Sequence, residues 1–378
     1  MRLIVIIFVL LIGSGLVIAR FDRFGAGTQI TANVDNLVVE EDTGEFARAY
    51  QVVPIRFPDD LGQHPDFQAE WWYYTGNLAD TAGNRYGFQL TFFRRGLTPG
   101  LTARDSEWGG NQIYFAHFTV TDVTGQTFNY HERFSRGGPE LAGVQSKPYH
   151  VWLDDWQARE TAPGQVELSA SADDIALNLV LEQAKPAALQ GDRGLSQKSD
   201  EPGNASYYYS LTNNPARGTI TTPRDSFEVT GNAWKDHEWS TSGLGPKAVG
   251  WDWFSLQLDD GREIMYFNIR KEDGTVEAVS SGTLIERDGS TRYLPQATVE
   301  IEVLDHWQSP ASGATYPSAW RFAIPSAGID LQIKPLLPQQ ELRVSFTYWE
   351  GAVELQGTQS GYGYIEMTGY YNSMQGRL

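Results

Sequence analysis

The chain has 378 residues, with 47 acidic and 29 basic side chains and a formal net charge of −18. This charge repels phosphate backbones and anionic lipid headgroups, so nucleic acid is excluded as an expected partner. The sequence contains no cysteine, which excludes thiolate catalysis, cysteine-ligated zinc, disulfides and a lipidated cysteine. The length exceeds one typical domain, and we expect two domains of similar size.

Residues 1–19 have the pattern of an export signal. Arg2 precedes an apolar stretch, and small residues follow up to Ala19. A retained anchor is the alternative, since the apolar stretch approaches the shortest length that crosses a bilayer. Both interpretations place the folded part in the periplasm or cell envelope. Residues 20–48 have no clear period, and we expect an extended leader there.

After the leader, apolar and polar side chains alternate with a period of two, which is typical of half-buried strands. Phe88, Leu90 and Phe92 show the pattern, and turn sequences such as 82–84 and 259–261 recur between such segments. No window beyond the signal gives a convincing amphipathic helix. The sequence therefore predicts an all-β protein.

Four segments recur in the same order in the two halves, which indicates an internal duplication. The pairs are a tryptophan-led hairpin at 70–95 and again at 238–271, then 153–157 with 304–308, 175–189 with 329–342, and 227–231 with 365–369. We predict two tandem lipocalin-like antiparallel β-barrels, residues 49–233 and 234–378. A barrel of about eight strands can hold one small apolar ligand.

Four tryptophan-, tyrosine- and glycine-rich blocks carry a specific resemblance: HPDFQAEWWYYTGNL at 64–78, GNAWKDHEW at 231–239, GWDWFSLQLDDG at 250–261 and GYGYIEMTGY at 361–370. Together they resemble the lipocalin-like predicted secreted hydrolases, the AttH-like family, which is related to the carotenoid 1,2-hydratases. The resemblance spans residues 64–370. It implies two joined lipocalin-like barrels, export from the cytoplasm, and association with a transporter of the ABC type.

In the hydratase branch, the resemblance implies catalysis by a His-x-Trp pair and a Tyr-x-Asp pair whose aspartate protonates a double bond. The first pair falls on His237 and Trp239, and the second falls on Tyr266 and Asn268. Because a carboxamide cannot deliver a proton to carbon, Asn268 departs from the pattern. We therefore expect another carboxyl group, Asp236, Glu238 or Asp252, to supply the acid.

The segment 234–239 concentrates titratable groups between indole rings. On an extended chain Asp236 and Glu238 share one face and His237 lies on the other. A carboxyl among indoles should have a raised pKa, as a general acid requires. Three interpretations stay open: a buried structural cluster, a catalytic site, or a ligand or metal site. Since the sequence has no His-x-His and no HExxH pattern, we predict no metal and no cofactor.

A second set of residues is expected to be structural. Glu70 lies beside Trp72 in the first copy, and a buried glutamate requires a cation, for which Arg94 or Arg95 is available. Trp72 with Arg94 would close one end of the first barrel, and Arg270 would do the same in the second copy.

The predicted function is binding of an extended apolar lipid or isoprenoid, followed by acid-assisted addition of water or hydrolysis. Asp236 or Glu238 would donate the proton and His237 would orient or deprotonate water, while Trp239, Trp251 and Tyr266 would stabilise the developing cation. The remaining ring and amide groups expected at the ligand are Trp253, Tyr207, Tyr209 and Asn268. The alternatives are a non-catalytic lipid carrier that works with an ABC-type transporter, and a structural envelope protein.

Overall fold

The computed structural model describes residues 46–101, 110–138 and 140–376. The predicted signal or anchor and most of the predicted leader lie outside these ranges. The described helical turns are three short 3-10 segments, η2 (Asp59–Leu61), η3 (Gln296–Thr298) and η4 (Pro325–Ala327). No helix of the described residues is long and apolar enough to span a bilayer. The all-β prediction is confirmed.

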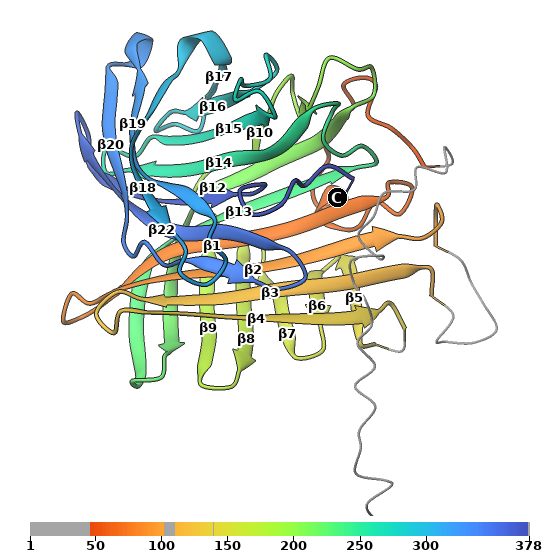
Figure 1. The fold of residues 1–378 in the computed structure, drawn as a ribbon. Coiled ribbons are helices and arrows are strands. Elements are labelled where there is room, and N and C mark those ends of the chain that lie inside the picture. The colour runs from red at the N-terminus through yellow and green to blue at the C-terminus, as the bar shows by residue number, and fades with distance from the viewer. Residues whose placement is uncertain (1–45, 102–109, 139, 377–378) are drawn as a thin grey trace, which may run out of the picture. The chain divides into compact units, whose positions relative to one another are not determined.

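Thirteen strands of the described residues form the first sheet, and all of the sheet's strand pairs are antiparallel (Figure 1). The main path runs β4-β3-β2-β1-β13-β12-β9-β8-β7-β6-β5, and β10 and β11 pair with β12. The strands are β1 (Ala69–Asp80), β2 (Arg85–Gly96), β3 (Gln112–Asp122), β4 (Thr127–Arg136), β5 (Ala142–Ser146), β6 (Tyr149–Leu153), β7 (Trp156–Ala162), β8 (Gln165–Ala172), β9 (Ile175–Glu182), β10 (Ala188–Leu189), β11 (Leu195–Gln197), β12 (Ala205–Thr221) and β13 (Ser226–Ser240).

The second sheet repeats this plan in its ten strands. Its main path is β17-β16-β15-β14-β23-β22-β20-β19-β18, with β21 paired to β22. Four consecutive strands thus lie beside the last strand of the copy in both sheets, which is the arrangement that a duplication predicts. The strands are β14 (Ala248–Leu258), β15 (Glu263–Lys271), β16 (Ser281–Ile285), β17 (Thr291–Pro295), β18 (Glu300–Gln308), β19 (Thr315–Ile324), β20 (Ile329–Pro335), β21 (Glu341–Arg343), β22 (Thr347–Gly357) and β23 (Gly361–Met367).

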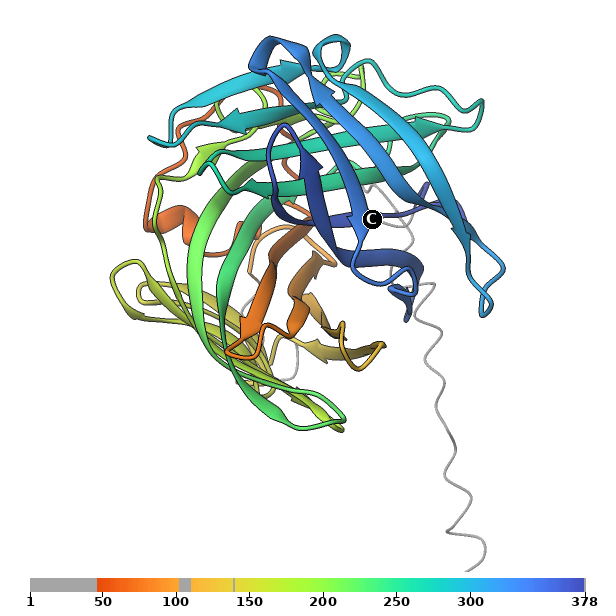
Figure 2. The same cartoon turned by 90° about the vertical axis from the view of Figure 1, so that its left-hand side faces the viewer.

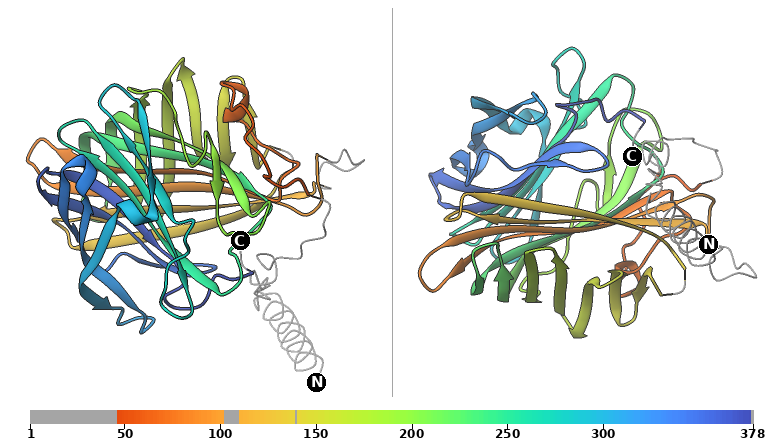
Figure 3. Two further views of the ribbon diagram at one scale, coloured as in Figure 1. Left: turned by 90° about the horizontal axis from the view of Figure 1, so that it is seen from above. Right: turned by 60° about the horizontal axis from the view of Figure 1, so that its bottom comes forward.

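Both sheets curl into barrel-like shapes, as Figure 2 shows, and each surrounds its own apolar core. The two tandem lipocalin-like barrels are thereby confirmed. In Figure 3 strands β5 to β9 cross one side of β1 to β4, and the second sheet lies on the other side. The inner strands of this group are therefore covered on both faces, so every residue of β3 is buried, whereas β4 at the sheet edge is only half-buried.

The change from one sheet to the other lies between Ser240 and Ala248. All of β13 pairs within the first sheet, where it lies between β1 and β12. The boundary predicted after residue 233 thus falls inside β13, and the segment 234–239 belongs to the first barrel. The repeated segment 227–231 suggested that the first copy ends near residue 233. Its last strand, β13, instead continues to Ser240, paired along its length with β1.

The two sheets contact each other through the faces that point away from their own cores. Tyr73, Tyr208 and Trp234 of the first sheet pack against Trp253 and other apolar side chains of the second. At a second place, His117 Nδ1 lies 2.7 Å from the Tyr348 hydroxyl. Side chains of both copies therefore surround the region between the two sheets.

Candidate functional site

Strand β13 divides the titratable cluster between two places, because alternate side chains leave a strand on opposite faces. His237 and Trp239 face the first barrel, whereas Asp236 and Glu238 face the second sheet. This is the division that the alternation predicts. The structure therefore has two separate polar sites, one inside an end of the first barrel and one between the two sheets.

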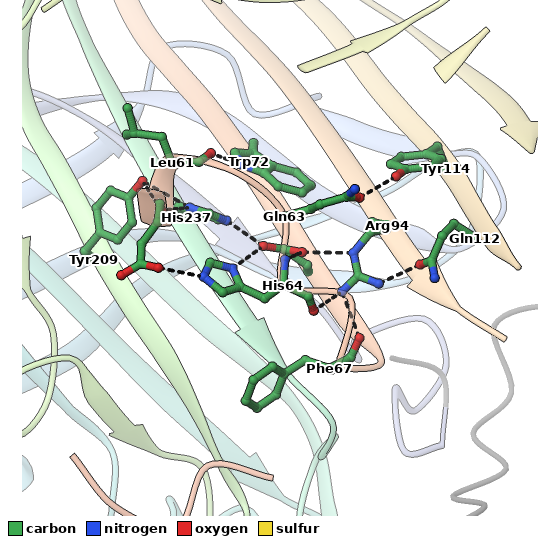
Figure 4. A network of polar contacts seen from close by, with 12 residues as sticks. Leu61, Gln63, His64, Phe67, Trp72, Arg94, Gln112, Tyr114, Tyr209 and His237 are labelled. Carbon is green, nitrogen blue, oxygen red and sulfur yellow. Dashed lines mark hydrogen bonds and ion pairs between the residues drawn. The ribbon is translucent and has the colours of Figure 1, made fainter. Parts of the chain in front are cut away.

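The site inside the first barrel is built around the buried carboxylate of Glu70, on β1 (Figure 4). Arg94 donates from Nε to Oε2 at 2.9 Å. His64 Nδ1 and His237 Nε2 lie 2.8 and 2.9 Å from Oε1. Burial alone would raise the pKa of Glu70, but the charges of Arg94 and His64 and the hydrogen bonds hold it well below its usual value. The His64 backbone amide also donates to Oε2, at 2.8 Å, so Glu70 is an anion with four donors.

The two histidines of this site carry different charges. His64 has Glu70 at one ring nitrogen and Asp60 at the other, at 3.1 Å, so both nitrogens must be protonated to donate. Burial would lower the pKa of His64, but the two carboxylates raise it to about 9. Trp239 stacks on this cation, with the ring centroids 3.8 Å apart. For His237, burial prevails and lowers the pKa to about 4, so this ring is neutral.

His64, Glu70 and His237 are the described residues that bring three potential ligand atoms together, all within 4.8 Å of one another. In the structure these atoms bond to each other through protons. His64 Nδ1 and His237 Nε2 both point at Oε1 of Glu70, and Arg94 donates to Oε2. A divalent cation would have to compete with a buried guanidinium for the same carboxylate. The arrangement fits a hydrogen-bonded closure of the barrel end better than a metal centre.

The site between the sheets is a cleft with a volume of about 130 Å³. Its walls come from both copies, and seven of the lining side chains are aromatic. These are Trp71, Tyr73, Phe93, Tyr208, Trp251, Trp253 and Phe267. The charged or ionisable groups that share the walls are Asp236, Glu238, Glu366 and Lys198.

Asp236 is held in place by three donors. Ser210 Oγ and the Trp234 indole donate to Oδ1 at 2.5 and 2.7 Å, and the Tyr208 hydroxyl donates to Oδ2 at 2.6 Å. Burial raises the pKa of this carboxyl to about 7, against the opposing effect of these hydrogen bonds. Both of its oxygens are occupied, which fixes the carboxyl but leaves little freedom to approach a ligand.

Glu366, on β23, is the less constrained acid of the cleft. The Trp251 indole donates to Oε1 at 2.6 Å, and Oε2 has no hydrogen-bond partner among the described residues. Burial raises the pKa of Glu366 to about 7, and the negative charges of Asp236 and Glu238 act in the same direction. A carboxyl with this pKa is present in both protonation states near neutral pH, so it can donate or accept a proton.

Glu238 is paired, which distinguishes it from the other two acids. Lys198 Nζ lies 2.7 Å from its Oε1, and Ser206 also donates to that oxygen. The ammonium group of Lys198 lies 4.7 Å from the ring centroid of Phe267. Lys198 thus brings one cation to the rim of the cleft, where it neutralises Glu238 rather than Asp236 or Glu366.

Several predicted residues lie outside the cleft. On β15, Phe267 and Ile269 face the cleft, so Tyr266 points into the core of the second barrel and Asn268 shares its face. Burial raises the pKa of Tyr266. Neither Tyr266 nor Asn268 is placed to contact a molecule held beside Asp236, and the expected joint action of His237, Trp239 and Tyr266 with Asp236 is corrected accordingly.

On β12 the aromatic triplet is also split between faces. Tyr207 and Tyr209 pack with Trp239 in an apolar cluster beside the first barrel, and Tyr208, between them, lines the cleft. The predicted ligand residues Trp251 and Trp253 do line it. Tyr207 and Tyr209 therefore lie outside the cleft, and the Tyr209 hydroxyl lies 3.0 Å from His237 Nδ1 in the polar network of Figure 4.

The residues predicted to be structural lie in buried contacts. Trp72 stacks on His237 with centroids 4.9 Å apart, and its indole donates to the Leu61 carbonyl at 3.1 Å. Arg270 of the second copy pairs with Asp252 at 3.0 Å and lies over the Tyr370 ring at 3.7 Å. Each copy thus pairs an arginine with a carboxylate, Arg94 fully buried and Arg270 half-buried, and among the described residues no histidine joins the pair of Arg270 and Asp252.

Sequence reasoning missed His64, Lys198 and Glu366. Glu366 lies in the repeated segment 365–369, which the internal duplication marks, but the pairing that places it opposite Trp253 is a property of the folded sheet. His64 and Lys198 lie in irregular segments before β1 and after β11, where no period shows which way a side chain points.

Comparison with known proteins gives a consistent relationship. The family model described as AttH-like matches residues 48–370. A crystal structure of a protein assigned as AttH from Nitrosomonas europaea is 35% identical, covers 86% of this chain and 100% of its own, and has a TM-score of 0.77. A search of curated proteins found no match.

More distant structures share the fold. Kievitone hydratase from Nectria haematococca is 15% identical, with a TM-score of 0.63 over 87% of this chain and 98% of its own. CghA, solved with Sch210972, is 14% identical, with a TM-score of 0.51 over 86% and 95% of the two chains. The match over nearly the whole described part, together with the paired barrels, shows that this chain belongs to the AttH-like family.

Proposed function

We propose that the protein is an enzyme that adds water to a carbon–carbon double bond of an apolar molecule, such as an isoprenoid or an unsaturated lipid, in the cleft between the barrels. The observation that carries the proposal is Glu366, a half-buried acid with one unbonded oxygen at an aromatic wall. The fold shared with a hydratase is consistent with this chemistry but does not identify the substrate.

Protonation of an alkene requires an acid that is uncharged when the substrate arrives. Burial and the neighbouring negative charges supply this condition at Glu366, whose pKa of about 7 keeps a large fraction protonated at neutral pH. In the proposed step, Glu366 transfers its proton to one alkene carbon and becomes a carboxylate. The other carbon carries the positive charge.

The walls of the cleft are suited to a cation that forms there. The faces of indole and phenol rings attract positive charge, and Trp251 and Trp253 lie next to Glu366 in the paired strands β14 and β23. Water then adds to the cationic carbon, and the proton that it releases returns to the Glu366 carboxylate. The sum of these steps is one alkene and one water giving one alcohol, with the acid regenerated.

A test uses geranylgeraniol as the probe in 18O-labelled water, with mass spectrometry of the products. Wild-type protein should yield an alcohol that contains the label, and the rate should fall as pH rises through about 7, because Glu366 loses its proton. Glu366→Gln keeps the size of the side chain and should lower the rate by at least about 100-fold. Glu302→Gln, an exposed change on β18, is the matched control and should leave the rate unchanged.

The same experiment separates the enzyme from a lipid carrier. Trp71, Trp251 and Trp253 line the cleft, so a bound polyene should quench tryptophan fluorescence. Quenching without incorporation of label across a panel of isoprenoid and unsaturated lipid probes would favour the carrier and overturn the proposed reaction. Equal rates for Glu366→Gln and wild type would overturn the role of Glu366.

A further inference from the structure

A second cavity lies inside the first barrel, separate from the cleft, and a lysine forms part of its wall. Lys235 is only 2% exposed and points inward from β13, on the face opposite to Asp236. The cavity has a volume of about 60 Å³, which is enough for a molecule of a few heavy atoms. Its lining includes the exposed residues Gly164 and Gln183, where it meets the surface.

The amine of Lys235 is unusual in lacking a partner. Buried lysines are normally paired with a carboxylate, yet within the described residues no hydrogen bond or ion pair reaches Nζ. Its neighbours are rings: Nζ lies 4.2 Å from the ring centroid of Tyr149, 5.7 Å from that of Tyr74 and 5.8 Å from that of Tyr209. The Tyr74 and Tyr149 hydroxyls bond to each other at 2.8 Å, which leaves the amine free.

The ionisable groups around Lys235 decide its charge. Glu160 on β7 lines the same cavity and accepts a hydrogen bond from the Tyr149 backbone amide at 3.1 Å, so it lies near the amine without pairing with it. Burial lowers the pKa of Lys235 to about 7, and the charge of Glu160 opposes this only in part. Burial also raises the pKa of Tyr74, Tyr149 and Tyr209, and His237 is neutral, so these groups add no charge at neutral pH.

We propose that Lys235 is a nucleophilic amine that forms an imine with small aldehydes or ketones that enter the first barrel past Gly164 and Gln183. The nitrogen lone pair attacks the carbonyl carbon, and the carbonyl oxygen takes up the proton that the nitrogen loses. The carbinolamine then loses water to give the C=N bond, so that one carbonyl compound and one amine yield one imine and one water. Glu160 is the group in the cavity that can relay these protons.

The test uses the folded full chain, acetaldehyde and sodium cyanoborohydride, which reduces an imine to a stable ethyl group that peptide mapping locates. At pH 7 about half of the Lys235 amines are uncharged, whereas only about one in 2,500 amines of an ordinary exposed lysine is uncharged. Lys235 should therefore be ethylated at least about tenfold faster than the exposed Lys334. Lys235→Met should remove this adduct and leave the slow labelling of Lys334 unchanged.

Two further variants test the cavity itself. Val166 lines it, so Val166→Phe should fill it and protect Lys235 without changing the labelling of Lys334. Glu160→Gln removes a negative charge and should move the pH at which labelling of Lys235 is half-maximal to a lower value. An unmodified Lys235 in the native wild type, or equal labelling of Lys235 in Val166→Phe, would overturn the proposal. None of these outcomes depends on the activity proposed for the cleft.

Discussion

His64 offers the sharpest test of the electrostatics inside the first barrel, because its charge is required by geometry. Both ring nitrogens face carboxylate oxygens, of Glu70 at 2.8 Å and of Asp60 at 3.1 Å, and the ring stacks on Trp239. A neutral ring could donate to only one of them. We predict that the free energy of unfolding falls as pH rises from 6.5 to 9, and that His64→Gln makes this fall smaller by the contribution of the His64 proton.

The magnitude follows from the shift of the pKa from 6.5 in the unfolded chain to about 9 in the folded protein. Because the folded pKa is the higher one, the folded state binds the proton more tightly, so the stabilisation is complete below pH 6.5 and is lost as pH rises through 9. A shift of about 2.5 units at 1.36 kcal/mol per unit corresponds to about 3 kcal/mol. The His64 side chain is 18% exposed, so solvent screening reduces this value to about 2 kcal/mol.

Urea unfolding at pH 6 and pH 9 measures the contribution of the His64 proton, as the difference between wild type and His64→Gln in how far the free energy of unfolding changes between the two pH values. Lys235 has a folded pKa below its unfolded one, so it adds stability as pH rises above 7. That contribution is common to wild type and His64→Gln and cancels in the comparison. His306→Gln, which changes an exposed histidine on β18, is the control. The same pH dependence in His64→Gln and wild type, or an NMR titration of His64 with a midpoint near 6.5, would refute the reasoning.

Three further changes test the packing around the two sites by urea unfolding. Glu70→Gln should lower the free energy of unfolding by about 3–5 kcal/mol, since it leaves a buried arginine without its anion, whereas Glu182→Gln in an exposed ion pair should leave the urea midpoint close to that of wild type; equal shifts of the two midpoints would contradict this account. Burial raises the pKa of Glu350 well above its usual value, so the stabilisation that its proton gives the folded state is lost as pH rises above about 4.5. Glu350→Gln should therefore flatten the decline of the free energy of unfolding between pH 5 and 8. An unchanged slope would show that the Glu350 carboxyl does not cause the decline. Gly231→Ala should lower the free energy of unfolding by at least about 2 kcal/mol, because a Cβ there would stand 2.0 Å from the Asn77 carbonyl oxygen. An unchanged urea midpoint would contradict this close packing of β1 on β13.

The local alternation of side chains was sufficient to predict the strands and to predict which residues lie on each face of β13. The period of two separated Asp236 and Glu238 from His237, and the structure has the same separation. A strand's alternation depends only on its own backbone, so it can be read from adjacent residues. The contacts of His237 could not be read in this way. Its partner Glu70 is 167 residues away in the chain, and which residues of β1 and β13 lie opposite each other is set by the packing of the whole barrel.

The cleft was harder to predict for a reason that lies in the duplication itself. Asp236 is on β13 and Glu366 on β23, the strands that take the same place in the two sheets, and both face the region between the copies. The first copy contributes Asp236 and the paired Glu238, the second contributes Glu366, and each adds part of the aromatic wall, so neither half of the sequence alone contains both acids of raised pKa. Burial against the opposite copy then raises the pKa of both acids to about 7, which no spacing within one copy can indicate. The acid–base chemistry thus arises from the packing of two similar sheets, and substitutions that loosen the contact between them should return both carboxyls toward ordinary pKa values.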